Sequence, residues 1–181
     1  NNALSNIVNN RLVPLDVAAQ NNNNNIKKAF DCDMNSVYDY TAWQSLSTDE
    51  TAEVVAFFDM VTLSDIWIRN GNQKSEEEYI KNARIGRIDV VVYTTLGTEK
   101  FEFKLEDIYS PSLFSENYVK GFQRLQLPKA IENVHCVELW IRNWYQGSEN
   151  KYNLSITDIA FLGKAPDIPN PPVPLPETQP I

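Results

Sequence analysis

Cysteine, histidine and glycine are scarce in this sequence, and long hydrophobic runs are missing. The 181 residues include two cysteines, one histidine and six glycines. Cys32 and Cys136 are too few for a disulfide scaffold and lack the paired spacing of a zinc site, so they could form one bridge or none. With so few glycines there is no glycine-rich loop to hold a phosphate group. No apolar run approaches the roughly 20 residues of a membrane-spanning helix, so we expect no membrane insertion.

Positive charge is also low. Lysine and arginine number 16 against 24 aspartate and glutamate residues, which gives a formal net charge of -8. Nucleic acids and anionic membrane surfaces bind clustered cations, so this balance argues against both as partners. The first residues, NNALSN, lack the basic and apolar regions of a signal peptide. We therefore interpret the chain as a segment of a longer protein that has further domains.

The sequence offers no clear catalytic group. His135, the single histidine, adjoins Cys136 within a predicted strand. Successive side chains of a strand point to opposite faces, so these two residues do not form a nucleophile and base pair. Carboxylates are abundant, but no spacing singles out the acid and base of a glycosidase. We predict a protein that is not an enzyme. A hydrolase of sandwich fold is a further alternative, and it would require carboxylates that converge in a cleft.

Composition divides the chain into three parts. Residues 1–25 are rich in asparagine and show little apolar periodicity, so we predict an irregular lead-in. Residues 164–181 are predicted to form a linker, because this region holds seven of the ten prolines and proline favours extended backbone. The folded domain is predicted to span residues 26–163. Hydrophobic residues make up 43% of the chain, which is enough for one core.

Between the tails, runs rich in β-branched and aromatic residues alternate with turn signals. The runs that we expect to be strands are EVVAFF, LSDIWIR, IGRIDVVVYTT, EKFEFKLE, FQRLQL, VHCVELWIRN and NLSITDIAFL. In EKFEFKLE, Phe101, Phe103 and Leu105 fall on one face, which indicates an antiparallel sheet with one wet side. The pattern predicts an all-β fold, an antiparallel β-sandwich. SEEEYIKNA is the one segment that indicates a short helix, with acidic residues at its start.

The stretch FDCDMNSVYDYTAW, residues 30–43, is rich in oxygen ligands. The positions that match an EF-hand calcium loop are Asp31, Asp33, Asn35 and Asp39. Ser36 stands where that loop needs glycine, and Ala42 stands where it needs glutamate, so the stretch is not an EF-hand. Oxygen-rich loops outside helices can also hold calcium. The alternatives are a calcium loop or a solvated acidic turn.

The tetrapeptide WIRN occurs twice, at the ends of two predicted strands. It places Arg69 and Asn70, and then Arg142 and Asn143, where loops begin. These side chains could donate to sugar hydroxyls, and the aromatic residues that follow Asn143 could offer a ring face. The alternative is that the arginines form structural ion pairs with acidic residues.

Four local patterns, taken in order, carry a family resemblance. AFDCDMNSVYDYTAW is similar to an Asp-Gly-Asp loop followed by Thr-Ala-Trp, and IRNGNQKSEEEYIKNARI is similar to an Asn-Gly loop that leads to Tyr, Asn and Arg. WYQGSENKYNLSITDIAFLG is similar to a Tyr-x-Gly turn, and ITDIAF within it to a last strand. These patterns resemble the discoidin or galactose-binding-like jelly-roll family, and most closely its NADase-type glycan-binding domains of bacterial surface and secreted proteins. The resemblance covers roughly residues 26–163.

This resemblance implies an eight-stranded jelly roll without catalytic activity, which binds glycans through loops at one end. It also implies a structural calcium ion, held by Asp31, Asp33, Thr41 and Asp158, and an inward-facing Trp43. Combined with the WIRN pattern, it predicts seven ligand-binding residues: Asn70, Tyr79, Asn82, Arg84, Arg142, Trp144 and Tyr145.

The resulting hypothesis is a non-catalytic carbohydrate-binding module, extracellular or at the cell surface, that attaches a larger bacterial protein to a glycan or oligosaccharide. We expect it to be a monomer without an organic cofactor. The alternative is a protein-docking or translocation module, in which the same jelly roll contacts another domain of its own chain. A fold alone does not decide between these functions.

Overall fold

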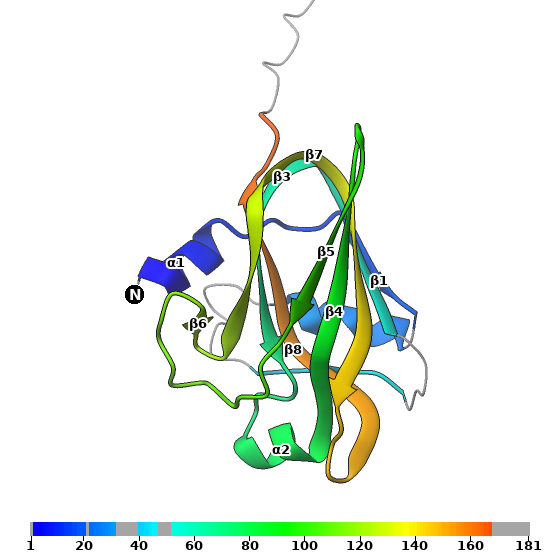
Figure 1. The fold of residues 1–181 in the computed structure, drawn as a ribbon, viewed down its shortest axis with the longest axis vertical. Coiled ribbons are helices and arrows are strands. Elements are labelled where there is room, and N and C mark those ends of the chain that lie inside the picture. Colours follow the sequence, from blue (N-terminus) through cyan, green and yellow to red (C-terminus); the bar gives the residue numbers. More distant parts are fainter. Residues whose placement is uncertain (1, 21, 32–39, 47–51, 168–181) are drawn as a thin grey trace, which may run out of the picture.

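Two long bent strands organise the fold. In the computed structural model, which describes residues 2–20, 22–31, 40–46 and 52–167, β3 spans Ala52–Asn70 and β7 spans Phe122–Tyr145. The two strands pair antiparallel, and both bend near their middle to form the arch at the top of Figure 1. Register shifts mark the bend, and Met60 on β3 and Asn133 on β7 have positive φ angles there. Such irregularities let a strand change direction.

The bend divides the strand pairings into two layers. One layer contains β1 (Asp16–Ala19), the first part of β3, the second part of β7, β4 (Asn82–Thr94) and β5 (Gly97–Lys104). The other contains β6 (Tyr118–Val119), the first part of β7, the second part of β3, β8 (Asn150–Lys164) and β2 (Trp43–Gln44). Among the described residues, the other pairings of the named strands are antiparallel, and the parallel contacts are a short one between β4 and β8 and a single bridge between Gly71 and Ile156. The predicted antiparallel β-sandwich of jelly-roll type is confirmed.

The main hydrophobic core lies between the two layers. Val90 and Leu139 contribute to it from one layer, and Ile66 and Phe161 contribute from the other. All four side chains are buried because alternate residues of each strand face the partner layer. Trp43 is also buried in this core, in agreement with the inward position expected for it.

The N-terminal region differs from the irregular lead-in that composition predicted. It contains α1 (Asn2–Asn9), β1 and the 3-10 helix η1 (Asn23–Phe30). Leu4, Ile7 and Val8 of α1 have the spacing of one helical face, and they pack with Trp67 and Phe122 in a second, smaller core cluster. Composition alone missed this helix because asparagine dominates residues 1–25, although the apolar residues of α1 have helical spacing.

The helix predicted in SEEEYIKNA is confirmed as α2 (Glu76–Lys81). It begins after Ser75, whose hydroxyl accepts a hydrogen bond from the Glu78 backbone N–H at 3.1 Å. Because α1 is also present, the prediction of a single short helix was wrong. β8 ends at Lys164, and the predicted linker beyond residue 167 lies outside the described residues. Within the described residues, no helix has the length and apolar character needed to cross a membrane.

Candidate functional site

Arg84 is the centre of a hydrogen-bond cluster at the end of the sandwich that carries α2. Its guanidinium forms a two-point contact with Asp107, with Nε donating to Oδ1 at 3.0 Å and Nη2 donating to Oδ2 at 2.8 Å. Nη1 donates to backbone carbonyls of Tyr79, Ile80, Asn82 and Gln146. Only 7% of Arg84 is exposed. This side chain therefore ties α2, β4 and the loop after β7 together.

Three other predicted ligand residues are engaged in the same way. Asn70 donates from Nδ2 to the Ile85 carbonyl at 2.8 Å and accepts from the Ile85 backbone N–H at 2.7 Å. The Tyr79 hydroxyl donates to Asp107 Oδ1 at 2.8 Å. Asn82 donates from Nδ2 to the Glu78 carbonyl, and its Oδ1 accepts from two neighbouring side-chain amides.

All four side chains are buried. Burial, together with the bond to Asp107, raises the pKa of the Tyr79 hydroxyl, so it stays a protonated donor. Buried backbone groups of loops need hydrogen-bond partners. Here the side chains that were predicted to face a ligand supply those partners. In the structure Asn70, Tyr79, Asn82 and Arg84 support the loops, and a role of these four residues in ligand binding stays a prediction.

The remaining predicted ligand residues lie on the last part of β7. Arg142 donates from Nε to Asp89 Oδ2 at 2.8 Å, which is the structural ion pair foreseen as an alternative. Trp144 is half-buried against the main core. Tyr145 is half-buried, and its hydroxyl donates to the Leu105 carbonyl at 2.8 Å. Of these three, Tyr145 lines a surface hollow, together with Gly86 and its neighbours.

The predicted calcium ligands are only partly described. Asp158 is fully buried, and its Oδ2 accepts from Arg69 Nη1 at 2.9 Å. Burial and the nearby Asp31 carboxyl together raise the pKa of Asp158 to about 8, against the opposing effect of Arg69. Thr41 is exposed, and Asp33 lies outside the described residues. No group of three or more acidic, histidine or cysteine side chains that could hold a metal occurs within the described ranges.

A polar hollow lies beside these residues. Its described lining consists of Tyr40, Thr41, Ala42, Gln44, Asn72, Lys74 and Ser155, and we refer to it as the Tyr40 hollow. It has a volume of about 530 Å³. Ser155 is 1% exposed, and its hydroxyl has no hydrogen-bond partner among the described groups. Buried hydroxyls are normally hydrogen-bonded, so this one marks a place where a partner is missing.

Sequence reasoning did not identify Gln44, Asn72, Lys74 or Ser155 as site residues. The Asn-Gly loop in the resemblance pointed to the correct segment for Asn72 and Lys74. Nothing in the sequence distinguishes Ser155 from other serines, because burial and the lack of a described partner for its hydroxyl are properties of the folded chain.

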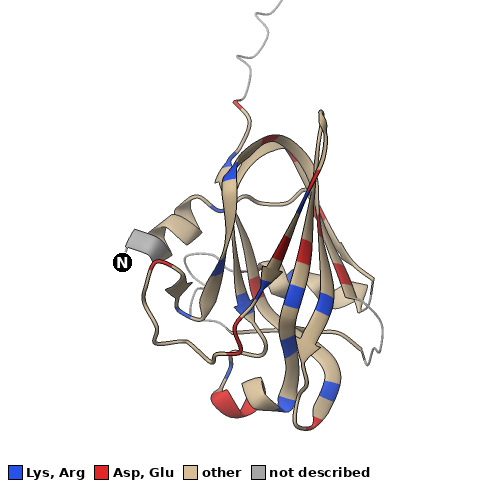
Figure 2. Cartoon of the chain, in the orientation of Figure 1, with Lys and Arg blue, Asp and Glu red and all other residues tan. Residues whose placement is uncertain are grey.

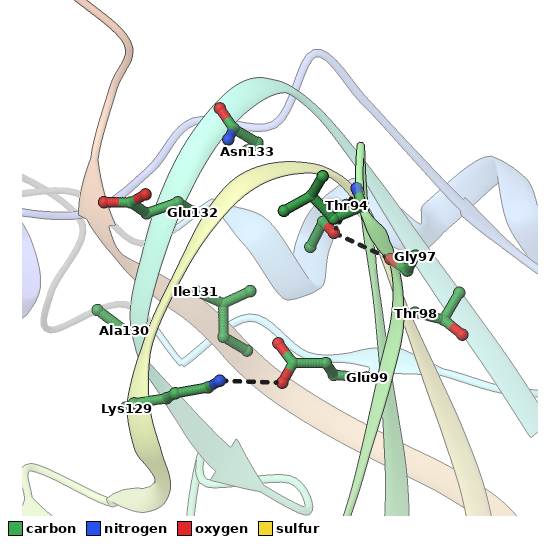
Figure 3. A pocket seen from close by; sticks show the side chains of 10 residues that line it. Thr94, Gly97, Thr98, Glu99, Lys129, Ala130, Ile131, Glu132 and Asn133 are labelled. Atoms are coloured by element: carbon green, nitrogen blue, oxygen red, sulfur yellow. Dashed lines mark hydrogen bonds and ion pairs between the residues drawn. The ribbon is translucent and has the colours of Figure 1, made fainter.

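A second hollow, of about 460 Å³, lies at the opposite end, between the β4–β5 turn and the arch of β7 (Figure 3). Lys129 and Glu99 form an ion pair across it at 3.4 Å, and the Thr94 hydroxyl donates to the Gly97 carbonyl at 3.0 Å (Figure 3). Leu96 at the tip of the turn is 94% exposed. Lys129 is thus already paired, whereas the Tyr40 hollow contains a buried hydroxyl without a partner among the described residues.

Comparison with solved structures supports the fold assignment. A family 32 carbohydrate-binding module of NanJ from Clostridium perfringens, solved with galactose, has a TM-score of 0.56 at 12% identity, with 81% of this chain and 91% of that chain covered. The CBM32-3 module of a family 31 glycoside hydrolase from Clostridium perfringens has a TM-score of 0.59 at 14% identity, with coverage of 86% and 96%.

A chitosan-binding module from the chitosanase/glucanase of Paenibacillus sp. IK-5 has a TM-score of 0.52 at 11% identity, with coverage of 87% and 98%. At such identities the likeness shows a shared fold. No curated protein matches the chain.

One comparison goes beyond the fold. Residues 13–162 match the family described as the NAD glycohydrolase translocation F5/8 type C domain. The match begins just before β1, runs through the two layers and ends within β8. It agrees with the resemblance found in the sequence. The chain therefore belongs to the family of NAD glycohydrolase translocation F5/8 type C domains.

Proposed function

We propose that the chain is a non-catalytic carbohydrate-binding module whose ligand occupies the Tyr40 hollow. One observation carries the proposal: the hollow contains the buried, unpartnered hydroxyl of Ser155 within a polar lining. Its volume of about 530 Å³ lies in the range of small-molecule sites, roughly 300–1,000 Å³. The described lining contains no carboxylate, so a neutral sugar meets no repulsive or strongly desolvated acid there.

The lining offers the two kinds of contact that sugars use. Ser155, Asn72 and Lys74 provide hydroxyl, amide and ammonium groups for sugar hydroxyls. Tyr40 provides an aromatic ring, and the guanidinium of Arg69 lies 4.7 Å from the centre of that ring. A cation against one ring face leaves the other face for the C–H groups of a sugar. The similar NanJ module, solved with galactose, and the similar chitosan-binding module support the same ligand class.

A calcium ion is part of this proposal, bound beside the hollow. Asp158 is fully buried, and the Asp31 carboxyl lies close enough to raise the pKa of Asp158. Carboxylate oxygens are the ligands that calcium prefers, so this donor pair fits the ion. Because Arg69 binds Oδ2, Asp158 would supply one oxygen. Asp33 and Thr41 complete the expected set, and the ion would hold the loop that leads to Tyr40.

The family description favours a second candidate function. The family is described as a translocation domain of NAD glycohydrolase. The jelly roll could therefore dock another protein domain instead of a glycan. In either function we propose a monomeric, extracellular or surface-located part of a longer bacterial protein, without enzymatic activity of its own. The two candidates differ in whether a free saccharide binds the Tyr40 hollow.

The test is a nuclear magnetic resonance titration of the labelled domain with galactose, N-acetylgalactosamine and chitosan oligomers. We expect amide shifts at Asn72 and Lys74. Ser155→Ala should weaken binding by roughly 2- to 10-fold without loss of stability, because the hydroxyl has no partner in the free protein. Ser148→Ala, at an exposed serine outside the hollow, is the matched control. Absence of any saccharide-dependent shift would favour the docking function.

A further inference from the structure

Arg87 stands apart from the other arginines of the chain. Among the described residues, the other five arginines each donate to a carboxylate or a backbone carbonyl. The Arg87 side chain is exposed on β4 and has neither a hydrogen bond nor an ion pair with any described residue. An arginine without a partner carries no evident structural role in a protein whose net charge is -8.

Lys104 and Asn143 flank Arg87 on the neighbouring strands. Arg87 is the register partner of Lys104 on β5 and also of Asn143 on β7. Neither neighbour makes a side-chain hydrogen bond or ion pair within the described part of the chain, and both are exposed. Two like charges directly opposite each other destabilise a sheet. The repulsion between Arg87 and Lys104 therefore lowers the stability of the sheet, and no described acidic side chain pairs with either cation.

The three side chains line one hollow. Together with Gly86 and Tyr145 they surround a volume of about 290 Å³, which we call the Arg87 hollow. Register shifts on both sides of Arg87 show that β4 and β7 are irregular at this point. Gly86 lies close to β7, and a Cβ there would be 3.3 Å from the Asn143 carbonyl oxygen. Bulges of this kind re-aim side chains and are frequent beside binding sites.

Neighbouring cations on the same sheet face form ion pairs, unlike Arg87 and Lys104. Asp89 forms ion pairs with Arg142 at 2.8 Å and with Lys100 at 3.6 Å, so each of those cations has an acidic partner. Figure 2 shows basic segments side by side on neighbouring strands of this sheet, with acidic segments further along the same strands. The Arg87 hollow is thus a local basic site on an acidic protein, formed by Arg87 and Lys104 together.

We propose that the Arg87 hollow binds an oxyanion, a sulfate or phosphate group, at Arg87 and Lys104. Guanidinium and ammonium groups bind such anions through charge-assisted hydrogen bonds. The Asn143 amide supplies a neutral donor beside them, and the half-buried Tyr145 ring offers an apolar wall to the remainder of the ligand. The site is separate from the Tyr40 hollow and does not depend on the function proposed for it.

The test is a titration of the isotope-labelled domain at low ionic strength with sodium sulfate, galactose 6-sulfate and galactose, against sodium chloride at matched ionic strength. We expect sulfate groups to shift the amide resonances of Gly86, Arg87 and Asn143. The double variant Arg87→Gln/Lys104→Gln should bind at least about tenfold more weakly. Lys100→Gln removes a paired cation from β5, the strand that also carries Lys104. This control variant should retain wild-type affinity.

The outcomes separate the sources of the anion. Equal shifts with sulfate and galactose 6-sulfate identify a site for the free ion, and shifts with galactose 6-sulfate alone identify a sulfated saccharide. Shifts at Asn72 and Lys74 with galactose report the Tyr40 hollow independently. Equal shifts with chloride, unchanged affinity in the double variant, or no shift at Gly86, Arg87 and Asn143 would overturn the proposal.

Discussion

Replacing Arg84 by methionine tests the assignment of this residue to structure instead of ligand binding. The variant loses both hydrogen bonds to Asp107 and leaves the carbonyls that Nη1 contacts without that donor. Breaking a buried pair by removing one partner costs about 3–5 kcal/mol, and an exposed pair costs about 0–1 kcal/mol. Because the Asp107 side chain is 35% exposed, we expect a loss of about 3 kcal/mol in the free energy of unfolding.

The assay is thermal unfolding followed by circular dichroism, combined with the saccharide titration. For a domain of this size, 1 kcal/mol corresponds to about 2–4 °C, so the midpoint should fall by roughly 10 °C. Arg87→Met is the matched stability control, since it removes an exposed arginine without partners from the same strand, and it should change stability by less than about 1 kcal/mol. An Arg84→Met protein that unfolds at the wild-type temperature but no longer binds saccharide would refute the structural role.

Three further predictions concern other parts of the fold. Ile7→Ala should lower the free energy of unfolding, measured in urea, by about 2–5 kcal/mol because Ile7 is fully buried. Ser5→Ala, on the exposed face of α1, should have little effect, and equal effects of the two variants would contradict the packing of α1 on the sandwich. Burial raises the pKa of Cys136 to about 11, so at pH 8 about a thousandth of it is thiolate, and in a Cys32→Ser protein a thiol reagent should react far more slowly before than after unfolding. Calcium should raise the unfolding midpoint by about 5 °C or more over the chelator-treated protein at saturation, and Asp31→Asn should abolish that difference; a midpoint unaffected by calcium would exclude the ion.

Patterns that repeat within a few residues were read correctly from the sequence. In β5, Phe101 and Phe103 pack on the core while the alternate residues are exposed, as the period of two predicted. The acidic residues of SEEEYIKNA indicated the start of α2. These signals depend only on the local geometry of a strand or helix, so no knowledge of distant contacts was needed.

The long strands could not be predicted in the same way. EVVAFF and LSDIWIR were expected to be two strands, but both belong to β3, which continues through the bend at Met60. FQRLQL and VHCVELWIRN likewise belong to β7. A bend and a turn produce the same interruption of the hydrophobic pattern, so only the pairing with a distant strand distinguishes them.

The candidate site was the least predictable part. Asn70 and Arg84 have residue types that suit a sugar ligand, but the same types suit the backbone groups of a loop, and the structure uses them for loops. The reverse holds for Ser155 and Arg87, which are inconspicuous in the sequence. Their distinguishing property is the absence of a partner within the described chain, and this property belongs to the folded arrangement.

The bend in β3 and β7 has a consequence for how the domain opens. Because each of these strands lies in both layers, neither layer can detach as an independent unit while the other persists. Small domains of this kind unfold in one cooperative step, and native-state hydrogen exchange measures the size of the opening units. Slowly exchanging amides before and after Met60 should therefore share one opening free energy, and the region near β2 should be as protected as the region near β5.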